Sequence, residues 1–198
     1  MRPLILFAPG AGAPSTSTWM QAWTGRLGTL GDVVAFDYPY MRAGRRSPDR
    51  PATLIAAHRE ALAAARQRFT GPVVLAGKSM GSRIGCHAAL VEPDVRALVC
   101  LGYPLKSGAT GAQRDEVLVA LRGPVLFVQG TRDPLCPLAA LAEVRPRMTA
   151  RHELYVVEGG NHSLELPKRQ LAAARQTQED ADARALGAIA KFLASALG

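Results

Sequence analysis

The sequence has few aromatic residues and no long apolar run, and each shortage argues against a class of protein. Aromatic residues make up 6% of the chain, and they are not interleaved with basic residues as in many nucleic-acid-binding surfaces. Uninterrupted apolar runs reach about five residues, far fewer than the roughly 20 that span a bilayer. The apolar part of Met1–Ala8 is likewise too short for a secretion signal, and we interpret it as a buried strand. We therefore expect no membrane partner and a cytoplasmic location.

Cysteine is also scarce. The three cysteines, Cys86, Cys100 and Cys136, are odd in number and have no C-x-x-C spacing. This pattern argues against a disulfide framework and against a zinc site. We expect Cys86 and Cys100 to be small core residues, and Cys136 to lie in a loop where it can be exposed.

Acidic residues are outnumbered, since 16 Asp and Glu face 24 Lys and Arg, giving a formal net charge of +8. Nucleic-acid binding is one explanation of such an excess. However, the basic residues are mostly arginines scattered through alanine-rich segments, so we favour a solvated basic surface and expect no nucleic-acid partner. One arginine cluster spans residues 42–50, and we hypothesise that this cluster, with Arg45 and Arg46, attracts an anionic substrate or an acidic carrier.

Short apolar runs alternate with helical patterns along the whole chain. The runs are rich in Val, Leu and Ile without polar alternation, which is typical of parallel strands covered on both faces. The expected strands are Leu4–Ala8, Val33–Phe36, Val73–Ala76, Ala97–Leu101, Val125–Gln129 and Leu154–Val157. The expected helices are Thr18–Leu30, Ala52–Phe69, Ser82–Leu90, Gly111–Leu121, Leu138–Met148 and Glu179–Leu197. This alternation predicts one α/β domain over residues 1–198, with a doubly wound, mostly parallel sheet of about six strands and helices on both faces.

One short motif indicates a chemistry. Gly77-Lys78-Ser79-Met80-Gly81 lies between an expected strand and an expected helix, where G-x-S-x-G forms a nucleophile elbow. At such a sharp turn, a Cβ in place of either glycine would clash, and the serine hydroxyl is held at the tip. The motif alone is weak evidence because chance matches are common.

Two further residues follow in the order that an elbow hydrolase requires, serine, then acid, then histidine. Asp133 comes directly after the fifth expected strand, where it could orient an imidazole. Of the four histidines, only His162 follows the last strand, in a glycine-rich loop that could bring its ring to Ser79. The alternatives are an Asx turn before Pro134 and a histidine on a surface loop.

The loop after the first strand, Pro9-Gly10-Ala11-Gly12, lacks bulky side chains, so its N–H groups can approach a ligand closely. We expect the backbone N–H groups of Ala11 and Met80 to form an oxyanion hole. The same glycines, with Asp37 after the second strand, also suggest a dinucleotide fold. Ser15 stands where that pattern needs its third glycine, so we disfavour this alternative.

Taken together, these residues resemble the α/β-hydrolase superfamily over nearly the whole chain, and more narrowly the small KANL/Tex-type group related to dienelactone hydrolases. The resemblance implies Ser79 as nucleophile, Asp133 as acid and His162 as base, without the first two strands of larger members. Pro9 and Ser82 depart from the usual histidine and glycine. Dienelactone hydrolases use a cysteine nucleophile, so their reaction does not carry over. The matching segments are residues 9–12, 36–41, 77–83, 102–105, 129–133 and 159–163.

The interval between the fourth and fifth expected strands is short, so we expect no cap domain and a shallow, open site. The side chains expected to line this site are those of Tyr38, Tyr40, Met41, Tyr103, Lys78, Arg45 and Arg46. Packing between loops is the alternative role for the tyrosines.

We predict a serine hydrolase that cleaves a small carboxylic ester or thioester through an acyl-enzyme, with no metal or organic cofactor. A non-catalytic protein-interaction module on the same fold is the alternative.

Overall fold

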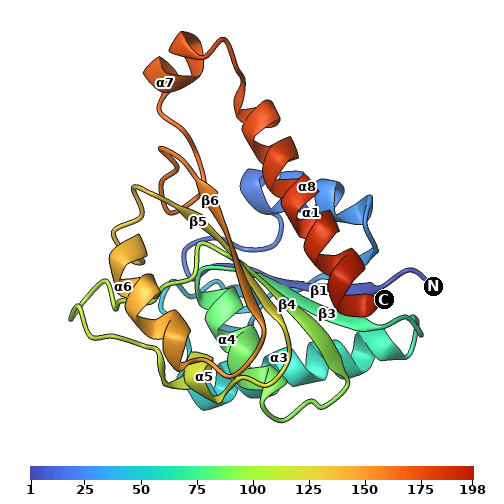
Figure 1. Ribbon diagram of the computed structural model, residues 1–198. Helices are drawn as coiled ribbons and strands as arrows, with labels where there is room; N and C mark the ends of the chain where they lie inside the picture. The colour runs from blue at the N-terminus through green and yellow to red at the C-terminus, as the bar shows by residue number, and fades with distance from the viewer.

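A computed structural model describes all 198 residues, and its centre is a six-stranded sheet (Figure 1). The sheet order is β2-β1-β3-β4-β5-β6, and every neighbouring pair is parallel. All the expected strands are present, with ends shifted by at most two residues. The strands are β1 (Leu4–Ala8), β2 (Asp32–Ala35), β3 (Val73–Lys78), β4 (Val95–Leu101), β5 (Val125–Gly130) and β6 (His152–Val157).

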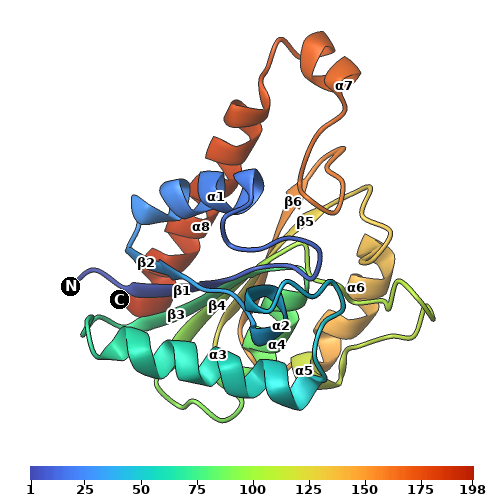
Figure 2. The same ribbon diagram turned by 180° about the vertical axis from the view of Figure 1, so that it is seen from behind.

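Helices cover both faces of the sheet, as the two opposite views show (Figures 1 and 2). One face is covered by α1 (Thr18–Gly28) and α8 (Gln178–Leu197). The other face is covered by α3 (Pro51–Arg66), α4 (Met80–Ala89), α5 (Glu116–Ala120) and α6 (Leu138–Val144). A 3₁₀ turn (Arg145–Arg147) follows α6.

Strand β1 explains why the apolar runs of the sequence do not alternate with polar residues. Leu4 and Leu6 point into the core beneath α3 and α4, whereas Ile5 and Phe7 point into the core beneath α1 and α8. All four side chains are at most 1% exposed. Burial on both faces requires an apolar residue at every position, and each such side chain contributes roughly 1.5–3 kcal/mol.

The helix expected over Gly111–Leu121 is the main error of the sequence prediction. The helix in this region, α5, begins at Glu116, and the preceding residues form an irregular loop bridged between Lys106 and Gln113. Gly111 has φ = +67°, a left-handed conformation that interrupts a helix. Two short helices were not expected, namely α2 (Pro39–Arg42) and α7 (Lys168–Ala173). Helix α7 buries no residue and projects from the body of the molecule (Figure 1).

The order in which strands are added to the sheet reverses at β1. Strand β2 lies on one side of β1, whereas β3 and the later strands lie on the other side. In such sheets, the loops at the carboxyl ends of the strands beside the reversal form a crevice. Here these loops are Pro9–Ser17 and the Ser79 turn. Between β4 and β5 the chain forms only a loop and the five-residue α5, so no cap domain covers this edge. None of the helices combines the length and apolar character needed to cross a bilayer.

Candidate active site

Ser79 lies at the turn between β3 and α4 with φ = 51° and ψ = −117°, outside the usual regions for a residue with a side chain. The flanking glycines make this turn possible. A Cβ at Gly77 would lie 2.3 Å from the Ser82 nitrogen, and one at Gly81 would lie 2.4 Å from the Ala8 oxygen. Both contacts are with backbone atoms, in α4 and in β1, which cannot move aside without disturbing those elements. The strained backbone therefore persists at a site where a hydroxyl is exposed at the tip.

The structure brings Ser79, His162 and Asp133 together. The distance between Ser79 Oγ and His162 Nε2 is 2.8 Å, and that between His162 Nδ1 and Asp133 Oδ2 is also 2.8 Å. The Asp133 side chain is fully buried, whereas that of His162 is 26% exposed. With the proton on Nδ1 donated to Asp133, Nε2 is free to accept the proton of the serine hydroxyl.

Asp133 is held as a carboxylate by several donors. Gln129 Nε2 donates to Oδ2 at 2.5 Å, and the Leu135 N–H donates to Oδ1 at 2.8 Å. Burial alone would raise the pKa of Asp133, but the bonds from His162, Leu135 and Gln129 lower it below its ordinary value. Gln129 is fully buried on β5 and was not anticipated, because nothing in the sequence distinguishes it from a core residue.

The loop after β1 lies beside Ser79, as expected for an oxyanion hole. A Cβ at Gly10 would come within 3.5 Å of Ser79 Cβ. The Ala11 N–H has no hydrogen-bond partner in the chain, and Met80 is the first residue of α4, a position whose N–H has no acceptor within the helix. The Tyr40 hydroxyl donates to the Ala11 oxygen at 2.9 Å and so fixes the loop.

A cavity of about 270 Å³ opens beside Ser79, between the loop after β1, the first turn of α1 and the His162 loop. Lys78 lines it, as expected. Trp19 and Met20 also line it but were not predicted, because their helical spacing is equally typical of core residues. The lining comprises Gly10, Ala11, Gly12, Ala13, Ser17, Trp19, Met20, Lys78, Ser79, His162 and Ser163.

Four predicted lining residues lie outside this cavity, which corrects the sequence interpretation. The rings of Tyr38 and Tyr103 are 0% exposed, because large aromatic side chains at the loop bases complete the core. The Tyr38 hydroxyl bonds to His58 Nδ1 at 3.1 Å, and the Tyr103 hydroxyl donates to the Arg114 oxygen at 3.1 Å. Tyr40 is 1% exposed, and Met41 packs with Tyr38 in the same core cluster. The packing role left open for the tyrosines is therefore the observed one.

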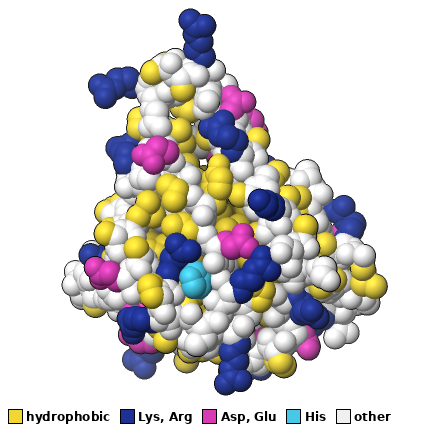
Figure 3. Space-filling view, viewed as in Figure 1, with side chains coloured by type: hydrophobic (Ala, Val, Ile, Leu, Met, Phe, Trp, Pro, Cys, Tyr) yellow, Lys and Arg dark blue, Asp and Glu magenta, His cyan; other side chains and the backbone are white.

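Arg45 and Arg46 also lie outside the cavity, on an exposed loop after α2. The Arg45 guanidinium is 2.6 Å from Asp49 Oδ1, so part of its charge is neutralised. Attraction of an anionic substrate by this loop stays a prediction. On the face drawn in Figure 3, Lys and Arg side chains are spread among apolar and acidic groups. Cys136 lies in a loop, as expected, but the exposure that this position allowed is not observed, since the residue is fully buried.

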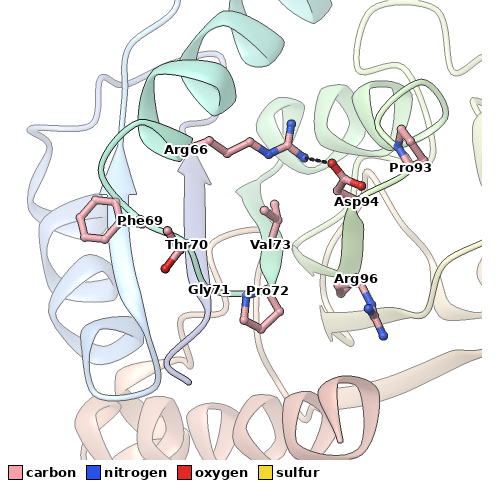
Figure 4. A pocket seen from close by; sticks show the side chains of 9 residues that line it. All are labelled: Arg66, Phe69, Thr70, Gly71, Pro72, Val73, Pro93, Asp94 and Arg96. Carbon is pink, nitrogen blue, oxygen red and sulfur yellow. Dashed lines mark ion pairs between the residues drawn. The ribbon is translucent and has the colours of Figure 1, made fainter.

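A larger hollow, of about 440 Å³, lies at the opposite edge of the sheet, where β3 and β4 begin (Figure 4). Its most prominent polar feature is the ion pair between Arg66 and Asp94, at 3.4 Å. No serine, cysteine or histidine lines it, and its carboxylate, Asp94, is paired with Arg66, so it lacks a nucleophile activated by a histidine. The residues capable of acyl chemistry thus lie at the carboxyl edge.

Comparisons with known proteins agree with this architecture. A family model described as an alpha/beta hydrolase domain matches residues 1–194. Among solved structures, dienelactone hydrolase from Anabaena variabilis is 17% identical with a TM-score of 0.71, and the match covers 100% of this chain and 88% of that one.

Est1E from Butyrivibrio proteoclasticus, solved with ferulic acid, is 16% identical with a TM-score of 0.70, covering 98% of this chain and 89% of that one. The RedJ thioesterase of the prodiginine pathway in Streptomyces coelicolor is 21% identical with a TM-score of 0.62, covering 87% and 84%. At these identities the structural matches establish a shared fold. The narrower KANL/Tex-type resemblance stays a prediction.

Proposed function

Because the chain belongs to the alpha/beta hydrolase domain family, we propose that it is a serine hydrolase that cleaves a carboxylic ester or thioester through an acyl-enzyme. The observation that carries this proposal is the unbroken set of contacts from Ser79 Oγ to His162 Nε2 and from His162 Nδ1 to Asp133, both at 2.8 Å. This set lies beside a cavity and two backbone donors suited to an oxyanion.

In the first half-reaction, Ser79 Oγ attacks the substrate carbonyl carbon while its proton passes to His162 Nε2. The carbonyl oxygen becomes an oxyanion and accepts hydrogen bonds from the Ala11 and Met80 N–H groups. Asp133 stabilises the imidazolium that forms. His162 then returns the proton to the departing alkoxide or thiolate, and the acyl group stays on Ser79.

In the second half-reaction, a water molecule takes the place of the leaving group. His162 Nε2 removes a proton from this water as its oxygen attacks the acyl carbon. Collapse of the second oxyanion breaks the bond to Ser79 Oγ, which recovers its proton from His162. The products are a carboxylic acid and the free enzyme.

A fluorophosphonate probe tests the proposal, since it phosphonylates only activated serines and releases fluoride. We expect one adduct on the wild type and none on Ser79→Ala. Ser47→Ala is a matched control, because Ser47 is an exposed serine outside the cavity, and it should be labelled like the wild type. A folded wild-type protein that remains unlabelled would contradict the proposal and favour a non-catalytic interaction module.

Esters and thioesters of one acyl group then identify the leaving group. Deacylation is common to both series because they form the same acyl-enzyme, so only the acylation rates differ. The preference for an oxygen or a sulfur leaving group is thus measured by kcat/KM, which reports acylation. Where deacylation limits turnover, the ester and the thioester should have the same kcat.

A further inference from the structure

Two successive carbonyl groups of the histidine loop are each held by a side chain from another part of the fold. Lys78 Nζ, from the end of β3, donates to the His162 oxygen. The Trp19 indole N–H, from α1, donates to the Ser163 oxygen at 2.9 Å. The two side chains also contact each other, since Lys78 Nζ lies 5.4 Å from the centre of the Trp19 ring.

Lys78 is an unusual residue to bury. It is 8% exposed, and no carboxylate lies within ion-pair distance of its ammonium group. Lysine is almost never buried without a partner of opposite charge, because removing an ammonium group from water is costly. A methionine would fill the same space at a lower cost. The ammonium group is therefore more readily explained by a function than by packing.

The Trp19 ring is held in place by two aromatic rings of the core. It lies 5.6 Å from that of Trp23 and 6.5 Å from that of Phe7, which are both buried in the core beneath α1. The indole N–H is thus presented to the Ser163 oxygen from a rigid support. Because β3 and α1 are both anchored in the core, the two donors can hold the loop in one position.

The loop itself has features that would otherwise leave it poorly constrained. It contains Gly159 and Gly160, and Leu164 adopts φ = +64°, which is unfavourable for a leucine. No cap domain covers it, and the His162 side chain remains partly exposed. A displacement of about 1 Å in a catalytic group can lower a rate by about 100-fold.

We propose that Lys78 and Trp19 are positioning residues that clamp the His162 and Ser163 carbonyl groups and so keep the imidazole between Ser79 and Asp133. This inference rests on the proposed function of the same site. Neither residue exchanges a proton with the substrate; both act through the backbone of the histidine loop.

The first test compares Lys78→Met with Lys191→Met, since Lys191 is an exposed lysine of α8. Lys78→Met should lower kcat by at least about 10-fold with KM changed less than about two-fold, because transition-state geometry is lost while ground-state binding is kept. Lys191→Met should match the wild type. Trp19→Phe removes the indole N–H together with the five-membered part of the ring, keeps a six-membered ring beside Trp23 and Phe7, and should lower kcat in the same direction. The double variant should lose less than the product of the two single losses.

The pH profile separates positioning from packing. The Lys78 ammonium faces His162, and the carboxylates of Asp133 and Glu165 lie in its surroundings; burial, partly offset by these two charges, lowers its pKa to about 8. Its charged hydrogen bond weakens above that pH, so wild-type kcat should decline on an alkaline limb near pH 8. That limb should be missing in Lys78→Met and shifted to higher pH in Lys78→Arg, whose guanidinium stays charged.

The outcomes distinguish this inference from the proposed function. A wild-type protein that is folded but neither labelled nor active would contradict the proposed function. An active wild type whose kcat and pH limb are unchanged in Lys78→Met and Trp19→Phe would overturn the clamp alone. If Lys78→Met fails to fold, Trp19→Phe decides, since it removes the donor to the Ser163 oxygen and keeps an aromatic ring against the core.

Discussion

The turn that holds the Ser79 hydroxyl depends on Gly77 and Gly81, which lie two residues before and after it and have no side chains. Gly77 should be irreplaceable, since a Cβ there would lie 2.3 Å from a backbone nitrogen of α4. Gly77→Ala should destabilise the fold by about 3 kcal/mol or more, as measured by urea unfolding. Gly187→Ala is a matched control, because Gly187 lies in α8 and a Cβ added there would meet no atom within 4 Å. It should gain roughly 0.5–1 kcal/mol from helix propensity.

For Lys78→Met, the expected change in stability has the opposite sign to the expected change in activity. Its pKa is lowered to about 8 by burial, so the unfolded chain binds the proton more tightly than the folded one. Burial of the charged form therefore costs stability below pH 8, and the cost disappears as the pH rises toward the unfolded value of 10.5. Lys78→Met should match or exceed the wild-type stability at pH 7 while losing activity. A clear loss of stability in thermal unfolding would contradict this explanation.

At this scale, the sequence allowed prediction of residues whose role depends on type and order. Ser79, Asp133 and His162 were expected together because a strand precedes each and only one histidine follows the last strand. Gln129 and Trp19 could not be assigned, since a buried amide or aromatic ring has the same sequence pattern whether or not it contacts a site. Tyr38 and Tyr103 illustrate the reverse error, because their loop positions suggested exposure and their rings complete the core.

At the scale of helices and strands, α4 is held in place by α3 through an uncharged histidine. His58 is 0% exposed and its ring lies under Gly85, where a Cβ would be 3.4 Å from Cε1. Burial lowers the pKa of His58 to about 3, and its Nε2 has no hydrogen-bond partner. The packing of α4 against α3 therefore requires the neutral ring.

This histidine should make the fold sensitive to acid. Below pH 6.5 the unfolded chain binds a proton at His58 that the folded chain excludes until about pH 3, so stability falls as the pH falls through this window. Between about pH 7.5 and 5.5 the loss should be about 1.4 kcal/mol from this group. Urea unfolding at both pH values should show a smaller difference in His58→Gln. An equal pH dependence in the two proteins would show that His58 is not responsible.

The strands were predictable because burial on both faces leaves only apolar residues in them. The short helices α2 and α7 were not predictable, since helices of four and six residues are too short to show a hydrophobic period. The helix predicted over residues 111–121 was too long for a local reason. Gly111 adopts a left-handed conformation, although the composition of the segment is otherwise compatible with a helix.

At the scale of the whole molecule, the site lies at the carboxyl ends of the parallel strands, beside β1, where the strand order reverses. No cap domain covers this edge of the sheet. The cavity there is about 270 Å³, slightly smaller than the roughly 300–1,000 Å³ of common ligand pockets. Decanoyl esters should therefore have kcat/KM values no higher than those of butyryl esters, because methylene groups that extend beyond the cavity remain in water and add no binding energy. A series of p-nitrophenyl esters measures this, and a maximum at decanoyl would contradict it.

The whole mechanism depends on Ser79 carrying the acyl group during turnover. Acid quenching of the enzyme during hydrolysis of p-nitrophenyl butyrate, followed by mass spectrometry of the intact and digested protein, detects that group where it is attached. We expect one butyryl group on the peptide containing Ser79, and none in Ser79→Ala. Turnover that persists in Ser79→Ala, or a butyryl group on another residue of the wild type, would show that Ser79 is not the nucleophile.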